Sequence, residues 1–184
     1  MRKGVVIAGF GGQGVMLVGE LLAEAGMEEN KYVTFLPSYG PEQRGGTANC
    51  HVVISDTTIA SPIVSKPDAI IVFNLPSLDK FEPTVKENGV IIINKSLVPR
   101  EVRRNDVRVL QIDVQSVAEE IGSPKVMNMI LLGAYTEIEK PVSLTTLKKA
   151  MSVILTGRKA SLIELNEKAL DRGAEIAKEF MGVI

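Results

Sequence analysis

Short runs of apolar residues recur along the chain, with stretches of helical spacing between most of them. These runs lie at residues 5–8, 32–36, 48–54, 69–73, 90–93 and 107–112. Strands that alternate with helices are typical of the α/β class, in which helices cover a largely parallel sheet. The run at 90–93 contains only β-branched residues, which favours a strand that is buried on both faces.

The spacing of two apolar runs predicts that their strands pair in an antiparallel manner. The run at 48–54 follows the run at 32–36 too closely for a helix of ordinary length between them. The segment Ser-Asp-Thr-Thr at 55–58 predicts a turn into a short partner strand at 59–60. The chain has 184 residues, of which 45% are apolar, and this suffices for one core. We therefore expect a single domain over residues 1–184, with a Rossmann-like layered fold and a mostly parallel, mixed central sheet flanked by helices.

After Asp113 the pattern becomes helical. Residues 126–134 are apolar nearly all round, which predicts a buried helix, and Gly133 within it would allow close helix packing. Ser143 is placed to cap the N-terminus of the next helix. The last helix has an apolar stripe made of Leu162, Leu165, Ala169, Gly173, Ile176 and Phe180.

A glycine-rich segment, Gly-Phe-Gly-Gly-Gln-Gly at 9–14, joins the first apolar run to a helix with an apolar stripe. The free N–H groups and the positive end of such a helix suit an anion. We take as candidate binding residues Gly11, Gly12, Gln13 and Gly14. The alternative is that these glycines only let the helix pack tightly on the sheet.

The same segment meets part of two nucleotide-binding motifs. Its glycine spacing is that of the dinucleotide fingerprint, in which a carboxylate at the end of the second strand holds the adenosine ribose. Here that strand ends in Phe35-Leu36-Pro37 without a carboxylate. No Gly-Lys-Ser/Thr closes the loop, so a phosphate-binding P-loop with its magnesium is excluded.

A second glycine-centred loop, Pro-Ser-Tyr-Gly-Pro-Glu-Gln-Arg-Gly-Gly, covers residues 37–46. Its prolines fix φ, its glycines permit conformations closed to other residues, and Arg44 between them is a planar cation with five donors. We add Arg44, Gly45 and Gly46 to the candidate binding residues. The alternative is a surface turn with a solvated arginine. Because both loops follow strands, we expect residues 9–14 and 37–46 to lie side by side at one edge of the sheet.

These two loops carry a family resemblance. Gly-Phe-Gly-Gly-Gln-Gly-Val at 9–15 and Pro-Ser-Tyr-Gly-Pro-Glu-Gln-Arg-Gly-Gly-Thr-Ala at 37–48 resemble the signature loops of the gamma subunit of 2-oxoacid:ferredoxin oxidoreductases. The segment from 127 to 134 resembles the following helix of that family. The second loop is more similar to the 2-oxoglutarate, branched-chain and pyruvate types than to indolepyruvate oxidoreductases.

The resemblance implies an accessory subunit of a multisubunit enzyme that decarboxylates a 2-oxoacid, reduces ferredoxin and makes an acyl-CoA, or runs in reverse. It implies thiamine-binding alpha and beta subunits and a ferredoxin-like delta subunit as partners, with coenzyme A (CoA) contacted in part by the candidate residues. The [4Fe–4S] clusters must lie on partners, because a cluster needs several cysteine thiolates and this chain has only Cys50. Thiamine diphosphate and its Mg²⁺ are also expected on partners, since the Gly-Asp-Gly motif that holds them is missing here.

Composition agrees with such a subunit. With 21 basic and 22 acidic residues the net charge is −1, so no basic field favours nucleic acid. The apolar runs are too short to span a membrane, and Met1-Arg2-Lys3 leads directly into a strand and not into the apolar region of a signal peptide. One cysteine and no disulfide framework fit a reducing compartment. We expect a cytoplasmic protein with no membrane or nucleic-acid partner.

The remaining reactive side chains favour structural roles. His51 lies in a strand pattern and is expected to be a hydrogen-bonded structural histidine, and Cys50 a small buried apolar residue. The basic cluster Arg100, Arg103, Arg104 and Arg108 is interleaved with acidic residues and is interpreted as a solvated face. We predict no catalytic residue and no metal ligand in this chain. The competing function is a stand-alone nucleotide- or phosphate-binding Rossmann-like module.

Overall fold

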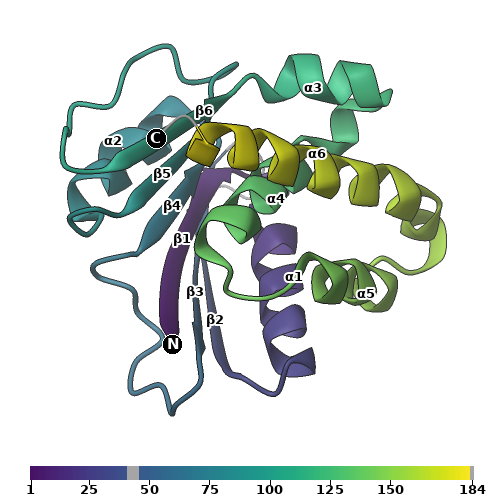
Figure 1. Cartoon of the computed structure of the whole chain (residues 1–184), viewed down its shortest axis with the longest axis horizontal. Coiled ribbons are helices and arrows are strands. Elements are labelled where there is room, and N and C mark those ends of the chain that lie inside the picture. The colour runs from purple at the N-terminus through teal and green to yellow at the C-terminus, as the bar shows by residue number, and fades with distance from the viewer. Residues whose placement is uncertain (41–45, 183–184) are drawn as a thin grey trace.

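The six apolar runs all form strands in the computed structural model, which describes residues 1–40 and 46–182. The strands are β1 (Arg2–Phe10), β2 (Tyr32–Tyr39), β3 (Thr47–Ser55), β4 (Ala69–Val72), β5 (Val90–Asn94) and β6 (Arg108–Ile112). They form one sheet in the order β2-β3-β1-β4-β5-β6 (Figure 1). The pairs β1–β4, β4–β5 and β5–β6 are parallel, whereas β3 is antiparallel to both β1 and β2. The mixed, mostly parallel sheet is confirmed.

The short strand predicted at residues 59–60 is wrong. No strand is present between Ser55 and Ala69 in the part of the chain that the structure describes. The physical reason is that β3 already has a partner on each side, β1 and β2, so its edges offer no free N–H or C=O groups to a further strand.

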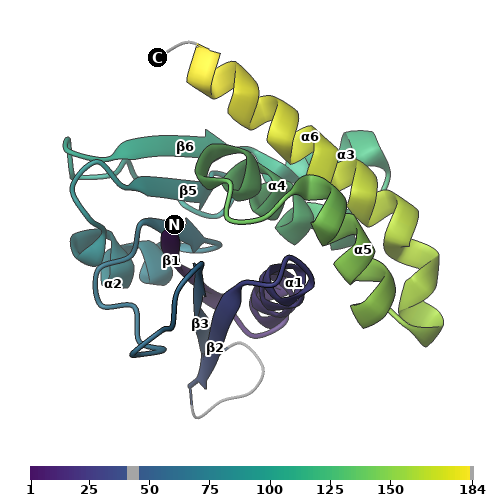
Figure 2. The same cartoon turned by 60° about the horizontal axis from the view of Figure 1, so that its bottom comes forward.

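Helices cover both faces of the sheet. Those of the described residues are α1 (Val15–Glu28), α2 (Leu75–Phe81), α3 (Val114–Ile121), α4 (Met127–Glu139), α5 (Leu144–Ile154) and α6 (Ile163–Gly182), with short 3₁₀ turns η1 (Glu82–Thr84), η2 (Pro124–Val126) and η3 (Gly157–Leu162). Figure 2 shows α1 and the C-terminal helices on one face and α2 on the other. None of these helices is long and apolar enough to cross a membrane.

Strand alternation divides the core into two clusters, one on each face of the sheet. Val5 and Ile7 of β1 belong to the cluster under α1, α4 and α5, whereas Val6 and Ala8 belong to the cluster with α2. Neighbouring side chains on a strand point to opposite faces, so both faces of the central strands must be apolar. This explains the continuous apolar runs in the sequence.

The largest helix-to-helix contact, between α4 and α6, depends on two glycines. A Cβ atom added at Gly133 would lie 2.0 Å from the carbonyl oxygen of Leu170, and one at Gly173 would lie 1.9 Å from that of Ile130. The two backbones therefore touch directly, as predicted for Gly133. Ser143 also caps α5 as predicted, because its side chain accepts a hydrogen bond from the Thr146 N–H at 3.0 Å.

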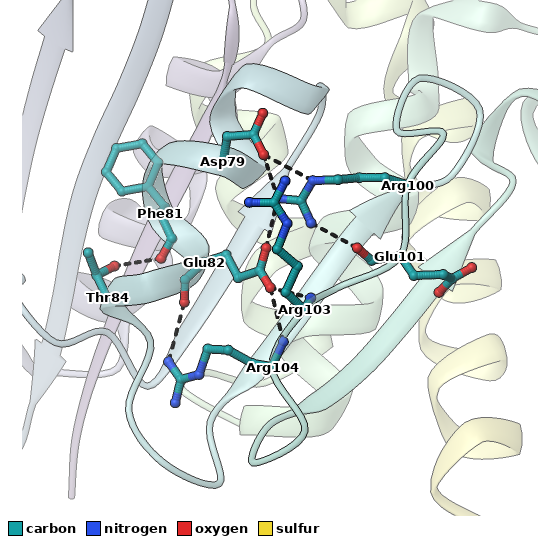
Figure 3. Close-up of polar contacts among 8 residues, drawn as sticks. All are labelled: Asp79, Phe81, Glu82, Thr84, Arg100, Glu101, Arg103 and Arg104. Atoms are coloured by element: carbon teal, nitrogen blue, oxygen red, sulfur yellow. Dashed lines mark hydrogen bonds and ion pairs between the residues drawn. The ribbon is translucent and has the colours of Figure 1, made fainter.

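The connection from β5 to β6 has no helix and is held by a buried carboxylate (Figure 3). The Glu82 side chain is only 4% exposed and accepts from Arg100 Nη2 at 2.7 Å and from the backbone N–H groups of Arg103 and Arg104 at 2.5 and 3.1 Å. Burial raises the pKa of Glu82, but these hydrogen bonds outweigh burial and lower it. Arg104 also pairs with Asp106. Arg100 and Arg104 thus hold this connection through ion pairs, and Arg108 pairs with Glu139 of α4, so these three arginines of the basic cluster are not simply a solvated face.

The α4–α6 contact gives a stability prediction. The change Gly173→Ala places a methyl group against backbone, which cannot rotate away, so the helices must separate. We expect a loss of about 1–3 kcal/mol in the free energy of unfolding, measured by urea denaturation. The matched control is Gly182→Ala, because nothing lies within 4 Å of its Cβ position. The control should be neutral or more stable by up to about 1 kcal/mol. Equal effects of the two changes would contradict the close packing.

Candidate functional site

The glycine-rich segment forms the turn between β1 and α1. Gly12 and Gly14 have φ values of 97° and 80°, which side-chain-bearing residues rarely adopt, so the turn requires glycine at both positions. Gly14 is the N-cap of α1. The strand-to-helix turn predicted for residues 9–14 is confirmed, and it lies at the carboxyl end of β1, where open α/β sheets bind their ligands.

The second loop adjoins the first. The Gly11 N–H donates to the carbonyl oxygen of Gly46 at 2.9 Å, and the Gly40 N–H donates to that of Thr47 at 2.7 Å. The expected side-by-side arrangement is therefore confirmed for Gly46, and Tyr39 lines one pocket together with Gly11 and Gly12. Arg44 and Gly45 lie outside the described residues.

The backbone donors of the first loop divide into two sets. Those of Gly11 and Gln13 are used inside the protein, by the carbonyl oxygens of Gly46 and Phe10. The N–H groups of Gly12 and Gly14 have no backbone partner among residues 1–40 and 46–182. Of the four candidate residues, Gly12 and Gly14 are thus the ones whose N–H groups are left without a partner by the described residues, while Gly11 ties the two loops together.

Gln13 holds the turn in shape with its side-chain oxygen. Its Oε1 accepts from the Phe10 N–H at 2.7 Å and from Asn74 Nδ2 at 3.2 Å. Asn74 follows β4, and its own oxygen caps α2 through the Ser77 N–H at 3.0 Å. The predicted use of Gln13 toward a ligand is thus limited to its Nε2 group.

Two asparagines at this site were missed by the sequence analysis. Asn128 of α4 is 6% exposed, and its Nδ2 lies 3.5 Å from the carbonyl oxygen of Gly14. Asn94 ends β5, is 2% exposed, and accepts from the Ser96 N–H at 3.1 Å. A usable signal was present for Asn94, because it is a polar residue directly at the carboxyl end of an apolar strand.

Two pockets flank the glycine turn and share Gly12, Gly14 and Leu17. One has a volume of about 290 Å³ and is lined by Gly12, Gln13, Gly14, Leu17, Phe73, Asn94, Leu97, Pro124, Lys125, Met127 and Asn128. We call it the amide pocket. The other, of about 340 Å³, is lined by Phe10, Gly11, Gly12, Gly14, Val15, Met16, Leu17, Tyr39, Ala48 and Lys159. We call it the lysine pocket.

A further hollow of about 370 Å³ lies near the far end of α1, around Glu29 and Lys31. The ammonium group of Lys31 already has partners inside the protein. Its Nζ donates to Glu29 Oε2 at 2.8 Å and to the carbonyl oxygen of Pro141 at 2.6 Å. These contacts join the start of β2 to the segment before α5, which indicates a structural role.

Cys50 and His51 are structural, as expected. Burial, with a smaller contribution from Glu20, raises the pKa of the Cys50 thiol to about 12, so it is not a reactive thiolate at neutral pH. His51 Nδ1 accepts from the Val64 N–H at 2.9 Å, and burial and nearby Lys80 lower the pKa of His51. Within residues 1–40 and 46–182, no group of three or more His, Cys, Asp or Glu side chains could hold a metal ion.

Comparison with known proteins gives the family. The family model for pyruvate ferredoxin/flavodoxin oxidoreductase matches residues 4–176. 2-Oxoglutarate synthase subunit KorC of Methanocaldococcus jannaschii is 38% identical over 182 residues, which cover 97% of this chain and 96% of KorC. The chain belongs to the pyruvate ferredoxin/flavodoxin oxidoreductase family, as the two loops indicated.

Other relatives are longer. Ketoisovalerate oxidoreductase subunit VorA of Methanothermobacter marburgensis is 36% identical over 176 residues, which cover 95% of this chain but 36% of VorA. The chain thus spans about a third of the length of that relative.

Solved structures share the fold. The gamma subunit of a keto/oxoacid ferredoxin oxidoreductase from Geobacter sulfurreducens superposes with a TM-score of 0.82 at 28% identity, covering 96% of this chain and 99% of that one. The 2-oxoglutarate:ferredoxin oxidoreductase of Magnetococcus marinus, solved with 2-oxoglutarate, coenzyme A and succinyl-CoA bound, gives a TM-score of 0.85 at 24% identity. That match covers 97% of this chain and 31% of the other, and its likeness concerns the fold.

His51 gives a pH prediction. Because its pKa is lowered from 6.5 in the folded protein, the unfolded chain binds the proton more readily. Stability is therefore full above about pH 6.5 and declines as the pH falls from there toward the folded-state pKa. Urea denaturation between pH 7.5 and 5.5 should show this decline in the wild type and a smaller one in His51→Gln. Identical declines would show that the Val64 N–H bond does not depend on the neutral ring.

Proposed function

We propose that this chain is the accessory gamma subunit of a multisubunit 2-oxoacid:ferredoxin oxidoreductase and that its two glycine loops contribute to CoA binding. The hydrogen bond from the Gly11 N–H to the Gly46 carbonyl oxygen carries the proposal. This bond joins the glycine-rich turn at residues 9–14 to the end of the second loop, at the carboxyl end of β1. The second loop is the feature that distinguishes this chain from a dinucleotide-binding domain. Both the family and the relatives named above are consistent with this assignment.

This chain does not carry the redox and thiamine chemistry of the reaction. Its single cysteine cannot hold an iron–sulfur cluster, and Cys50 is buried with a raised pKa. We therefore assign thiamine diphosphate, Mg²⁺ and the [4Fe–4S] clusters to partner alpha, beta and delta subunits, with ferredoxin as acceptor of the complex. The location proposed for the complex is the cytoplasm.

CoA fits the chemistry of the two loops. It carries a diphosphate and a 3′-phosphate. The N–H groups of Gly12 and Gly14, which have no partner among residues 1–40 and 46–182, and the N-terminus of α1 favour an anion. Lys159, from the distant η3 turn, lines the lysine pocket beside them and makes no ion pair within the described ranges. We assign the binding residues Gly11, Gly12, Gln13, Gly14, Arg44, Gly45 and Gly46 to this ligand.

One prediction from this proposal concerns the activity of the isolated chain. It should fold, because both faces of its sheet bury an apolar cluster, but should not oxidise a 2-oxoacid. Addition of the partner subunits should restore turnover, measured as reduction of ferredoxin or a viologen dye with oxoacid and CoA present. Dye reduction by the purified chain alone would contradict the accessory role, and failure to associate with thiamine- and cluster-bearing chains would favour a stand-alone binding module.

Another prediction from this proposal concerns Arg44. An arginine fork can donate two parallel hydrogen bonds to a phosphate, which a lysine cannot reproduce, and charge-assisted bonds contribute about 1.5–3 kcal/mol each. In the assembled complex, Arg44→Ala should therefore raise the KM for CoA about tenfold or more, and Arg44→Lys should restore little of this loss. The CoA-independent half-reaction should stay near the wild-type rate.

The matched control is Arg103→Ala, because Arg103 is exposed and lies on the β5–β6 connection near Glu82. This control should leave the KM for CoA unchanged. An unchanged KM in Arg44→Ala, with the complex intact, would remove Arg44 from the CoA site.

A further inference from the structure

Asn74 uses the two ends of its side-chain amide for two different partners. It lies between β4 and α2, is 3% exposed, and lines neither the amide pocket nor the lysine pocket. Its Oδ1 accepts from the Ser77 N–H at 3.0 Å, which caps α2, and its Nδ2 donates to Gln13 Oε1 at 3.2 Å. Asn74 thus contacts Gln13, which lines the amide pocket, without lining that pocket itself.

Capping of α2 alone does not account for an asparagine at position 74. Aspartate, which has the same shape, and serine cap helices about as well, because a cap needs only an oxygen that accepts from a backbone N–H group. The side-chain nitrogen of Asn74 is the part that capping does not use, and its partner is Gln13. This nitrogen therefore indicates a second role, toward the glycine turn.

Backbone N–H groups fix how both amides are turned. An N–H donor must meet an amide oxygen, so the Phe10 N–H, 2.7 Å from Gln13 Oε1, and the Ser77 N–H, 3.0 Å from Asn74 Oδ1, each orient one side chain. With both side chains turned in this way, the nitrogen of Asn74 meets the oxygen of Gln13. That oxygen has two donors, and Gln13 Nε2 makes no hydrogen bond with residues 1–40 and 46–182.

Gly9 makes room for this pair of amides. A Cβ atom at Gly9 would lie 2.6 Å from Gln13 Oε1 and 2.9 Å from Phe73 Cβ, so a side chain there would displace Gln13. The Phe73 N–H donates to the carbonyl oxygen of Ala8 at 2.9 Å, which holds the end of β4 against the end of β1. Because Asn74 directly follows Phe73, the sheet itself sets the position of Asn74 relative to the turn.

We propose that Asn74 is a positioning residue for the CoA site, which keeps the amide of Gln13 turned so that its Nε2 faces the ligand. This inference rests on the proposed function, in which Gln13 contacts CoA. The phosphates and carbonyl groups of CoA accept hydrogen bonds, and Nε2 can donate to them, whereas an amide turned by half a rotation would present an oxygen and repel them. Asn74 does not touch the ligand and acts only through Gln13.

The test uses the assembled complex with the change Asn74→Ser. Serine keeps a capping oxygen for α2, but its shorter side chain lacks the nitrogen that reaches Gln13. The readouts are the KM for CoA and kcat. We expect the KM to rise about three- to tenfold, as for one lost hydrogen bond. At saturating CoA, kcat should stay within about twofold of the wild type, because the contact is made equally in the ground state and the transition state.

A double-mutant cycle with Gln13→Glu separates positioning from a general structural effect. A carboxylate has two equivalent oxygens, so its rotation changes nothing at the ligand, and either oxygen can accept from the Phe10 N–H. Gln13→Glu should itself raise the KM for CoA, since the Nε2 donor is removed. In the Gln13→Glu background, Asn74→Ser should change the KM by less than about twofold, because no amide remains to be oriented.

The variant Asn74→Asp protects the test against a poorly folded Asn74→Ser protein. Aspartate keeps the shape and the capping oxygen of asparagine but places a second oxygen against Gln13 Oε1, so it should raise the KM for CoA at least as much. The matched control is Ser143→Ala, which removes the cap of α5 at a residue that lines neither pocket. This control should lower stability toward urea and leave the KM for CoA unchanged.

Three results would overturn the proposal. Additive effects in the cycle, or an unchanged KM in both Asn74 variants while Gln13→Glu raises it, would make Asn74 a helix cap only. An unchanged KM in Gln13→Glu would leave Asn74 with no ligand-contacting residue to position. The proposed function would stand in each case, since it is tested separately by reconstitution with the partner subunits and by Arg44→Ala.

Discussion

The site depends on the antiparallel register of β3 against β1, which places Phe10 opposite Thr47. Because β3 runs backwards between two parallel strands, its start lies beside the end of β1, and Tyr39 at the end of β2 lies opposite Ala48. Any shift by one residue would turn the β3 side chains to the wrong face and break the core on both sides. The core therefore fixes the register, and the register brings the two glycine loops together.

A second constraint acts across the sheet. The chain of hydrogen bonds from Phe10 through Gln13 and Asn74 to α2 joins the ends of β1 and β4. On the other face Asn128 lies so close to Gly14 that a Cβ there would be 2.3 Å from its nitrogen. Burial makes each of these amides costly to leave unpaired, so they hold the turn in one conformation. A preformed turn lowers the entropy cost of binding a flexible ligand such as CoA.

The strands and the glycine turn could be predicted from the sequence because their signals are local. Continuous apolar runs mark strands with two buried faces, and positions 12 and 14 need backbone that only glycine adopts readily. The prediction that failed depends on contacts between residues that are distant in the sequence. The strand predicted at 59–60 assumed that β3 needed a partner after it in the chain, whereas β1 and β2 fill both of its edges. Asn128 was missed because only the packing of α4 brings it to the turn, whereas Asn94 carried a local signal, a polar residue at the end of an apolar strand, that was not used.

Hydrogen–deuterium exchange of the assembled complex, with and without CoA, tests the central claim that both loops serve one CoA site. CoA should slow exchange in peptides covering residues 10–17, where the N–H groups of Gly12 and Gly14 lack partners in the described structure. Slower exchange should also appear at residues 125–128, which line the amide pocket in part. Peptides around Lys31, at the far end of α1, should be unchanged. Protection confined to the partner subunits, or to the region of Lys31, would contradict a CoA site at the two loops.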